Sequence, residues 1–278
     1  MKFQAKHISV NRTSLAYIEA GSGEDVVFVH GSLGDYRNWD HQVRAIGQSY
    51  HAVAYSRRGH YPNIWDPGNK DYSAEYHAED LREFIVKMGL QGCHLVGASY
   101  GALSCLVMAI KYPGLIASLT LGEPPILPWL KKLDGGYYHY ASFIQEAWEP
   151  AQRAFRANKL EEGVRNFLRG VTGRDAYPSL SEDMKQRLMD NAKEMQAEAL
   201  SRDIFPELTC EQVASVNIPV LLLSGEHSPP MFSLIEDELA RCLPDTMRFK
   251  IPKASHSLQT GNPTYYNKVL LDFLDQLG

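Results

Sequence analysis

The sequence predicts an α/β fold with a doubly wound, mostly parallel sheet and a helical cap inserted into it. Short apolar runs alternate with helix-compatible stretches from residue 26 to residue 125, and the alternation resumes at residue 219. Regular alternation of strand and helix is typical of parallel sheets covered by helices on both faces. Residues 126–216 contain no β-prone run. A segment of this length without a strand is too long for a simple connection between two strands. We therefore expect a core domain of residues 1–125 and 217–278 and a cap subdomain of residues 126–216.

The elements before the cap begin with two β-prone runs that predict a hairpin over residues 7–10 and 15–19. Continuous apolar runs, typical of strands buried on both faces, then predict parallel strands over residues 26–29, 51–55, 94–96 and 116–121. Helices are expected between them over residues 39–46, 75–88 and 99–112. Gly89 is a plausible end of the second of these helices.

The cap and the C-terminal part are predicted in the same way. Apolar spacing favours three cap helices, over residues 143–157, 160–170 and 182–199. Two further strands are expected over residues 220–224 and 247–251, with helices over 231–242 and 264–277.

The stretch Gly97-Ala98-Ser99-Tyr100-Gly101 lies between a predicted strand and a predicted helix. A Gly-x-Ser-x-Gly sequence at that junction has the layout of a nucleophile elbow, a strained turn that exposes a serine hydroxyl above the sheet. Small residues are needed beside Ser99 because strand and helix approach closely there. A flexible Ser/Gly loop would read the same way, so the neighbouring motifs must decide.

A serine hydroxyl is a poor nucleophile at neutral pH and needs a base within hydrogen-bond reach. In the elbow architecture this histidine comes last in the chain, on a loop after the final strand. Of the ten histidines, His256 alone follows the strand predicted over residues 247–251. We expect Ser99 to be the nucleophile and His256 the base, the alternative being an ordinary surface histidine.

These combined motifs resemble the α/β-hydrolase superfamily, whose members commonly carry a Gly-x-x-Asp after the strand that corresponds to residues 220–224. This chain has Ser228 in place of that aspartate. Glu123 ends the strand after the elbow helix, and the chain is similar there to zearalenone lactonases, which keep their triad acid as a glutamate at this place. The resemblance thus implies Glu123 as the acid that orients His256, and Glu226 is the alternative.

The resemblance also implies an oxyanion hole made by the backbone N–H groups of Tyr100 and Ser32. Leu33 is an alternative one residue on. His30 is expected to be structural.

The substrate-binding residues are expected to be Leu33, Trp129 and Tyr138. Trp129 and Tyr138 belong to an aromatic concentration after Glu123 that also includes Tyr137, Tyr140 and Trp148. Such residues suit an apolar or aromatic substrate, and they could equally pack the cap onto the core.

Composition points to an ordinary soluble protein. The 278 residues are 44% hydrophobic and 22% charged, with a formal net charge of −5. Scattered basic residues argue against nucleic acid or an anionic membrane as partners. The N-terminus has no secretory apolar region, and the four cysteines form no zinc pattern and are expected to be free thiols. We expect a cytoplasmic monomer or homodimer that uses no cofactor, since no phosphate-binding glycine loop or metal cluster is seen.

The expected activity is hydrolysis of a carboxylic ester or lactone through an acyl-enzyme. Ser99 in place of an aspartate distinguishes the chain from epoxide hydrolases and haloalkane dehalogenases. Two alternatives remain open at this point: C–C bond hydrolysis of a diketone-type substrate, and a non-catalytic relative that only binds a small molecule.

Overall fold

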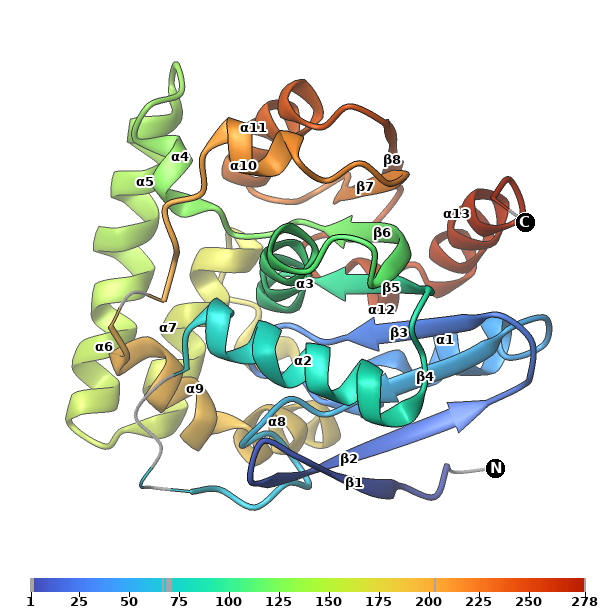
Figure 1. Ribbon diagram of the computed structural model, residues 1–278. Coiled ribbons are helices and arrows are strands. Elements are labelled where there is room, and N and C mark those ends of the chain that lie inside the picture. The colour runs from blue at the N-terminus through green and yellow to red at the C-terminus, as the bar shows by residue number, and fades with distance from the viewer. Residues whose placement is uncertain (1–2, 67, 69–71, 203, 278) are drawn as a thin grey trace.

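A mostly parallel sheet runs through the protein, with eight strands among the residues that the computed structural model describes (Figure 1). The described residues are 3–66, 68, 72–202 and 204–277, so the ends of the predicted core domain at residues 1–2 and 278, and residue 203 of the predicted cap, lie outside them. The strands are Lys6–Val10 (β1), Thr13–Ala20 (β2), Asp25–Val29 (β3), His51–Tyr55 (β4), Cys93–Ala98 (β5), Ile116–Gly122 (β6), Val220–Gly225 (β7) and Thr246–Ile251 (β8).

The strand order is β1-β2-β4-β3-β5-β6-β7-β8. Strand β2 pairs antiparallel with β1 and β4, and every other pairing is parallel. The predicted doubly wound, mostly parallel sheet and the predicted opening hairpin are therefore confirmed.

Helices cover both faces of the sheet. The helices of the predicted core are Tyr36–Trp39 (η1), Asp40–Ile46 (α1), Ala74–Met88 (α2), Tyr100–Lys111 (α3), Pro230–Cys242 (α11), Leu258–Gly261 (α12) and Pro263–Leu274 (α13). Gly89 ends α2 in the left-handed conformation, as expected. Along β3, Val27 and Val29 belong to the apolar cluster that includes residues of α2, α3 and α11, whereas Val26 and Phe28 belong to the cluster that includes residues of α1 and α13. This two-sided burial explains why the central strands read as uninterrupted apolar runs.

Residues 126–216, which lie within the segment between β6 and β7, are called the insertion below. Its helices are Leu127–Leu130 (α4), Gly136–Phe143 (α5), Ile144–Trp148 (η2), Glu149–Arg156 (α6), Leu160–Thr172 (α7), Tyr177–Ser179 (η3), Glu182–Asp190 (α8), Ala192–Leu200 (α9) and Cys210–Ala214 (α10). Helices α5 and α6 continue into one another through η2, a π-helical turn, so the helix predicted over residues 143–157 begins earlier than expected.

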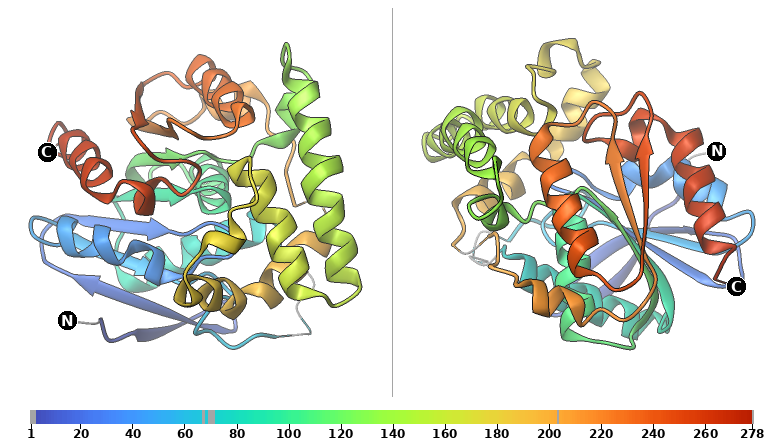
Figure 2. Two further views of the ribbon diagram at one scale, coloured as in Figure 1. Left: turned by 180° about the vertical axis from the view of Figure 1, so that it is seen from behind. Right: turned by 90° about the horizontal axis from the view of Figure 1, so that it is seen from above.

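The helix predicted over residues 182–199 is two helices, α8 and α9, because Asn191 breaks it. The Asn191 amide donates to Asp35 Oδ2 at 2.8 Å, and its carbonyl oxygen accepts from the backbone N–H of Tyr61 at 2.8 Å. These bonds tie the break to loops of the core. Helices α5, α6 and α7 of the insertion lie beyond the carboxyl ends of β3 and β5, whereas α10 lies beside α11, as Figures 1 and 2 show together.

Candidate active site

Ser99 occupies the sharp turn between β5 and α3. Its backbone has φ +51° and ψ −124°, a strained conformation for a residue with a side chain. A Cβ at Gly97 would lie 2.6 Å from Ala102 Cα, and one at Gly101 would lie 2.3 Å from the His30 carbonyl oxygen. The glycines on either side of Ser99 are therefore required by the close approach of strand, helix and the loop after β3.

Three predicted residues from distant parts of the chain meet at the carboxyl edge of the sheet. His256 Nε2 lies 2.8 Å from Ser99 Oγ, and His256 Nδ1 lies 2.7 Å from Glu123 Oε2. Since a carboxylate can only accept, the Nδ1–H donates to Glu123 and leaves Nε2 to accept from the serine hydroxyl. The ring of Phe232 stacks on the imidazole with centroids 4.2 Å apart, which further fixes its orientation.

Glu123 is held in place from a second side. It is only 2% exposed, and its Oε1 accepts a hydrogen bond from the backbone N–H of Gly225 at 2.8 Å. The alternative acid, Glu226, is exposed and accepts from the backbone N–H of Lys253 instead. The structure thus brings Glu123, and not Glu226, to His256.

The hydroxyl of Ser228 has no hydrogen-bond partner among the described residues. It lies so close to the chain at Gly225 that a Cβ there would be 2.6 Å from Ser228 Oγ.

The loop after β3 lies against Ser99. A Cβ at Gly31 would be 2.8 Å from Ser99 Cβ, and Leu33 adopts a positive φ of 58° in the turn that Gly34 closes by donating to the Gly31 carbonyl. His30 Nε2 accepts from the backbone N–H of Arg57 at 2.8 Å, so its Nδ1–H donates to the Gly31 carbonyl at 2.8 Å. His30 is a structural anchor, and burial with neighbouring Arg57 and His60 holds its pKa well below the usual value.

A small inner cavity of about 20 Å³ adjoins Ser99. Its wall is largely apolar and comprises Ser32, Ser99, Tyr100, Pro125, Leu127, Phe143, Trp148, Phe167, Val171, Glu198, Phe205, Met231 and Phe232. This volume holds about one water molecule.

Two of the three residues expected to bind substrate lie in the insertion but away from this cavity. Trp129 is buried in α4 and donates to the Leu208 carbonyl at 2.6 Å, so it packs the insertion together. Tyr138 is 73% exposed on the outer side of α5. The third, Leu33, is buried in the apolar cluster and lines neither this cavity nor the outer one described next. Of the aromatic concentration, Trp148 does line the inner cavity.

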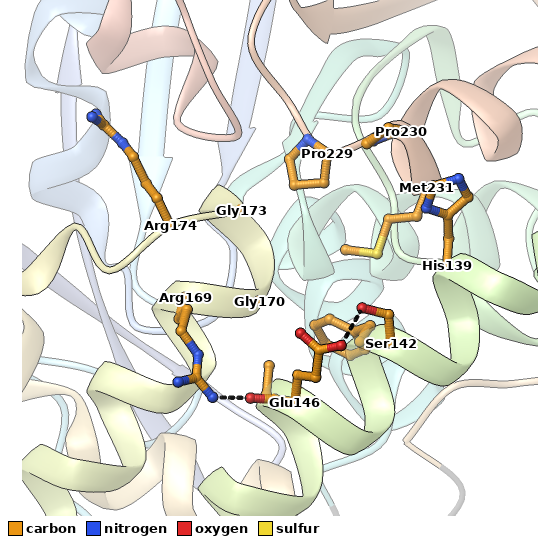
Figure 3. A pocket seen from close by; sticks show the side chains of 12 residues that line it. His139, Ser142, Glu146, Arg169, Gly170, Gly173, Arg174, Pro229, Pro230 and Met231 are labelled. Atoms are coloured by element: carbon orange, nitrogen blue, oxygen red, sulfur yellow. Dashed lines mark hydrogen bonds between the residues drawn. The ribbon is translucent and has the colours of Figure 1, made fainter.

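An outer cavity of about 310 Å³ lies between the insertion and the start of α11 (Figure 3). Its wall includes the polar residues His139, Ser142, Glu146, Arg169 and Arg174. Phe143 and Met231 line both cavities, so these two side chains stand between the outer cavity and the site at Ser99.

A buried group of ionisable residues behind the inner cavity was not predicted from the sequence. Helix α9 contributes Glu194 and Glu198, which face Arg57, His60 and His77 of the core. Burial raises the pKa of Glu194 to about 7 and, with repulsion from Glu194, that of Glu198 to about 8. Burial likewise holds the pKa values of His60 and His77 well below normal. Only the four-residue spacing of the two glutamates could have suggested a shared helix face.

The expectation of free thiols is wrong for two of the four cysteines. Cys210 of α10 and Cys242 of α11 form a disulfide, while Cys93 and Cys105 are free and buried. Glu238 lies within 4.8 Å of the paired sulfurs, but oxidised sulfurs offer no thiolate to a metal. Among the described residues, no helix combines the length and the apolar character needed to cross a membrane.

Comparison with known proteins gives relatives along the whole chain. The chain is 22% identical over 276 residues to 2-(acetamidomethylene)succinate hydrolase of Mesorhizobium japonicum, covering 98% of this chain and 96% of that protein. It is also 22% identical to 3-oxoadipate enol-lactonase 1 of Acinetobacter baylyi, covering 96% and 94% of the two chains.

Solved structures show the same fold. A carboxylesterase from Bacillus subtilis superposes with a TM-score of 0.76 at 19% identity, covering 99% of this chain and 92% of that one. The enol-lactonase from Burkholderia xenovorans superposes with a TM-score of 0.77 at 19% identity, covering 97% and 100%. The alpha/beta hydrolase fold family matches residues 26–263. The chain therefore belongs to the α/β-hydrolase family.

Proposed function

We propose that this protein is a serine hydrolase that cleaves a carboxylic ester or a lactone through an acyl-enzyme, with Ser99, His256 and Glu123 as its triad. The observation that carries the proposal is the unbroken series of contacts from Ser99 Oγ to His256 and on to Glu123, at 2.8 Å and 2.7 Å. A nucleophile, a base and an orienting carboxylate in this order match the arrangement that activates a serine hydroxyl.

In the proposed reaction His256 Nε2 takes the hydroxyl proton as Ser99 Oγ attacks the substrate carbonyl carbon. The negative oxygen that forms accepts hydrogen bonds from the backbone N–H groups of Tyr100 and Ser32. The imidazolium, stabilised by Glu123, then protonates the leaving oxygen as the C–O bond breaks. Water deprotonated by His256 attacks the acyl-enzyme and releases the acid and the free serine.

The substrate class rests on the cavity wall and on the relatives. The apolar side chains of Phe143, Phe167 and Phe232 favour an apolar acyl group beside Ser99. Relatives named as an enol-lactonase and a carboxylesterase support esters and lactones as the bonds cleaved. Because about 20 Å³ holds only one water, an acyl group enters when Phe143 or Met231 moves toward the outer cavity.

Replacement of the nucleophile tests the proposal. The variant Ser99→Ala should lose hydrolysis of p-nitrophenyl acetate and butyrate by about ten-thousand-fold or more, because no acyl-enzyme can form. A fluorophosphonate probe should label the wild-type protein once, at Ser99, with peptide mass spectrometry identifying the site.

The matched control is Ser118→Ala. Ser118 is a buried serine near the amino end of β6 whose hydroxyl contacts His94 Nδ1 at 2.8 Å. This variant should keep wild-type turnover and labelling. Wild-type turnover by Ser99→Ala would contradict the mechanism, and a wild-type protein that the probe leaves unlabelled but a ligand stabilises would favour the binding-only alternative.

A further inference from the structure

Glu198 of the insertion reaches the loop that carries the proposed oxyanion hole. Its Oε1 lies 2.5 Å from Ser32 Oγ, although the two residues are 166 positions apart in the chain. Glu198 is 1% exposed, and it lines the inner cavity together with Ser32 and Ser99. Among the residues that line this cavity, it is the one carboxyl group.

The groups that face Glu198 leave its charge poorly compensated. The Arg57 guanidinium of the core approaches Oε2 only to 3.5 Å and donates its Nε–H to the His30 carbonyl. Glu194, one turn earlier on α9, repels a second negative charge and itself faces His60 at 2.9 Å and His77 at 3.9 Å.

Burial lowers the pKa values of His60 and His77, which face Glu194, and of His30, which contacts Arg57, and so favours the neutral form of all three. Arg57 is thus the one cation facing this pair of glutamates among the described residues, and burial outweighs it. Burial and the repulsion from Glu194 therefore favour the protonated form of Glu198, against the hydrogen bonds from Ser32 and Arg57 that favour the ionised form.

The protonation state of Glu198 decides what the Ser32 hydroxyl can do. A neutral carboxyl group donates its O–H to Ser32 Oγ, which leaves the hydrogen of the serine hydroxyl free to point into the cavity. An ionised carboxylate can only accept, so it takes that hydrogen for itself.

We propose that the Ser32 hydroxyl is a third hydrogen-bond donor to the oxyanion formed at Ser99, and that neutral Glu198 is the positioning residue that keeps this donor available. The inference rests on the proposed serine-hydrolase function. No proton leaves Glu198 in the reaction, because its O–H only donates. A residue of the insertion thereby completes the machinery of the core.

The first test removes the hydroxyl and keeps the backbone N–H. Ser32→Ala should lower kcat for p-nitrophenyl acetate by about a hundredfold, the usual effect of losing one oxyanion donor, with KM little changed. Ser118→Ala is the matched control and should keep the wild-type kcat. A wild-type kcat in Ser32→Ala would overturn the proposal.

The second test replaces Glu198 with a neutral side chain of the same shape. In Glu198→Gln, Arg57 orients the amide with its oxygen toward the guanidinium and its NH₂ toward Ser32, so the serine hydrogen stays free at every pH. Wild-type kcat should fall about tenfold from pH 7 to pH 9, because the pKa of Glu198 is about 8. Glu198→Gln should keep its kcat over this range, and Ser32→Ala should also lack the decline.

A parallel decline in the wild-type protein and in Glu198→Gln would overturn the role of Glu198. Labelling with the fluorophosphonate distinguishes a failure of this inference from a failure of the proposed function. If the probe labels Ser99 of the wild-type protein, the wild type hydrolyses the ester and Ser32→Ala is unimpaired, only this inference fails. If the probe does not label Ser99 and Ser99→Ala keeps its activity, both the proposed function and this inference fail.

Discussion

Glu123 combines an unusual backbone with two side-chain contacts. Its φ is +48°, a conformation that costs a residue with a side chain about 1–3 kcal/mol. The conformation persists because the carboxylate is held by His256 on one oxygen and by the Gly225 N–H on the other. Pro124 and Pro125 follow directly and restrict the chain as it leaves the sheet.

The role proposed for Glu123 predicts a large effect of a small change. Glu123→Gln should lower kcat by about ten-thousand-fold, because an amide that donates to Nδ1 favours the wrong tautomer of His256. Glu226→Gln is the matched control and should keep kcat within about twofold, since an exposed side chain away from His256 carries little coupling energy. Steady-state kinetics with p-nitrophenyl butyrate would check both variants. The reverse result would transfer the role to Glu226.

At the scale of elements, α9 couples the insertion to the core through buried acids. Asn191 breaks the α8–α9 segment and is bonded to Asp35 and Tyr61 of the core, so α9 starts in a fixed direction. Glu194 and Glu198, four residues apart, then project from one face of α9 toward Arg57 and His60. Burial at this junction raises the pKa values of both glutamates, because it disfavours their charged forms.

The junction predicts a pH-dependent effect of Glu194→Gln on stability. Because the folded-state pKa of Glu194 is raised to about 7, its contribution is full below the usual value near 4.5 and is lost as the pH rises through 7. The unfolding temperature of the variant minus that of the wild type should therefore grow by roughly 5 °C or more between pH 5 and pH 8.

Thermal unfolding followed by circular dichroism would measure this difference. His60 and His77 also favour their neutral forms, so they stabilise the fold less as the pH falls. Both proteins contain these histidines, and their effect therefore cancels in the difference between the two unfolding temperatures. Glu226→Gln should give a flat difference. A difference that shrinks with rising pH would mean that Glu194 is ionised and paired with a charged His60.

The element scale also shows what the sequence could predict. Local sterics fix the turn at Ser99 through Gly97 and Gly101, and two-sided burial makes strands such as β3 recognisable, so the sheet and the turn were predictable. The contact of Glu198 with Ser32 was not, because it joins segments 166 residues apart and has no motif. The position of Tyr138 outside both cavities was not predictable either, because composition does not reveal which side of α5 faces them.

At the scale of the whole molecule, the disulfide joins the end of the insertion to the core. Cys210 in α10 and Cys242 in α11 are 32 residues apart and enclose β7 between them. A sequence with four dispersed cysteines gives no pairing, and for that reason free thiols were expected. Oxidised cysteines favour an oxidising environment, so they weaken the argument from thiols to a cytoplasmic location.

The disulfide predicts a measurable dependence of stability on reductant. Closing a loop of this length stabilises a fold by about 3–4 kcal/mol in the chain-entropy description. The double variant Cys210→Ser/Cys242→Ser should unfold roughly 5–10 °C lower than the oxidised wild type. Dithiothreitol should lower the wild-type value toward that of the double variant and leave the double variant unchanged. Equal unfolding temperatures in all four conditions would show that the bond contributes no stability.

The position of Glu123 has a consequence for protein engineering. The proposed acid, the nucleophile and the base all lie outside residues 126–216, and the acid precedes the insertion by only two prolines. A chimera that exchanges the insertion after Pro125 keeps the three proposed triad residues. It loses Glu198, however, and with it the hydrogen-bond partner of the Ser32 hydroxyl. The loop at Glu226–Pro229, relieved of supplying the acid, is correspondingly open to redesign.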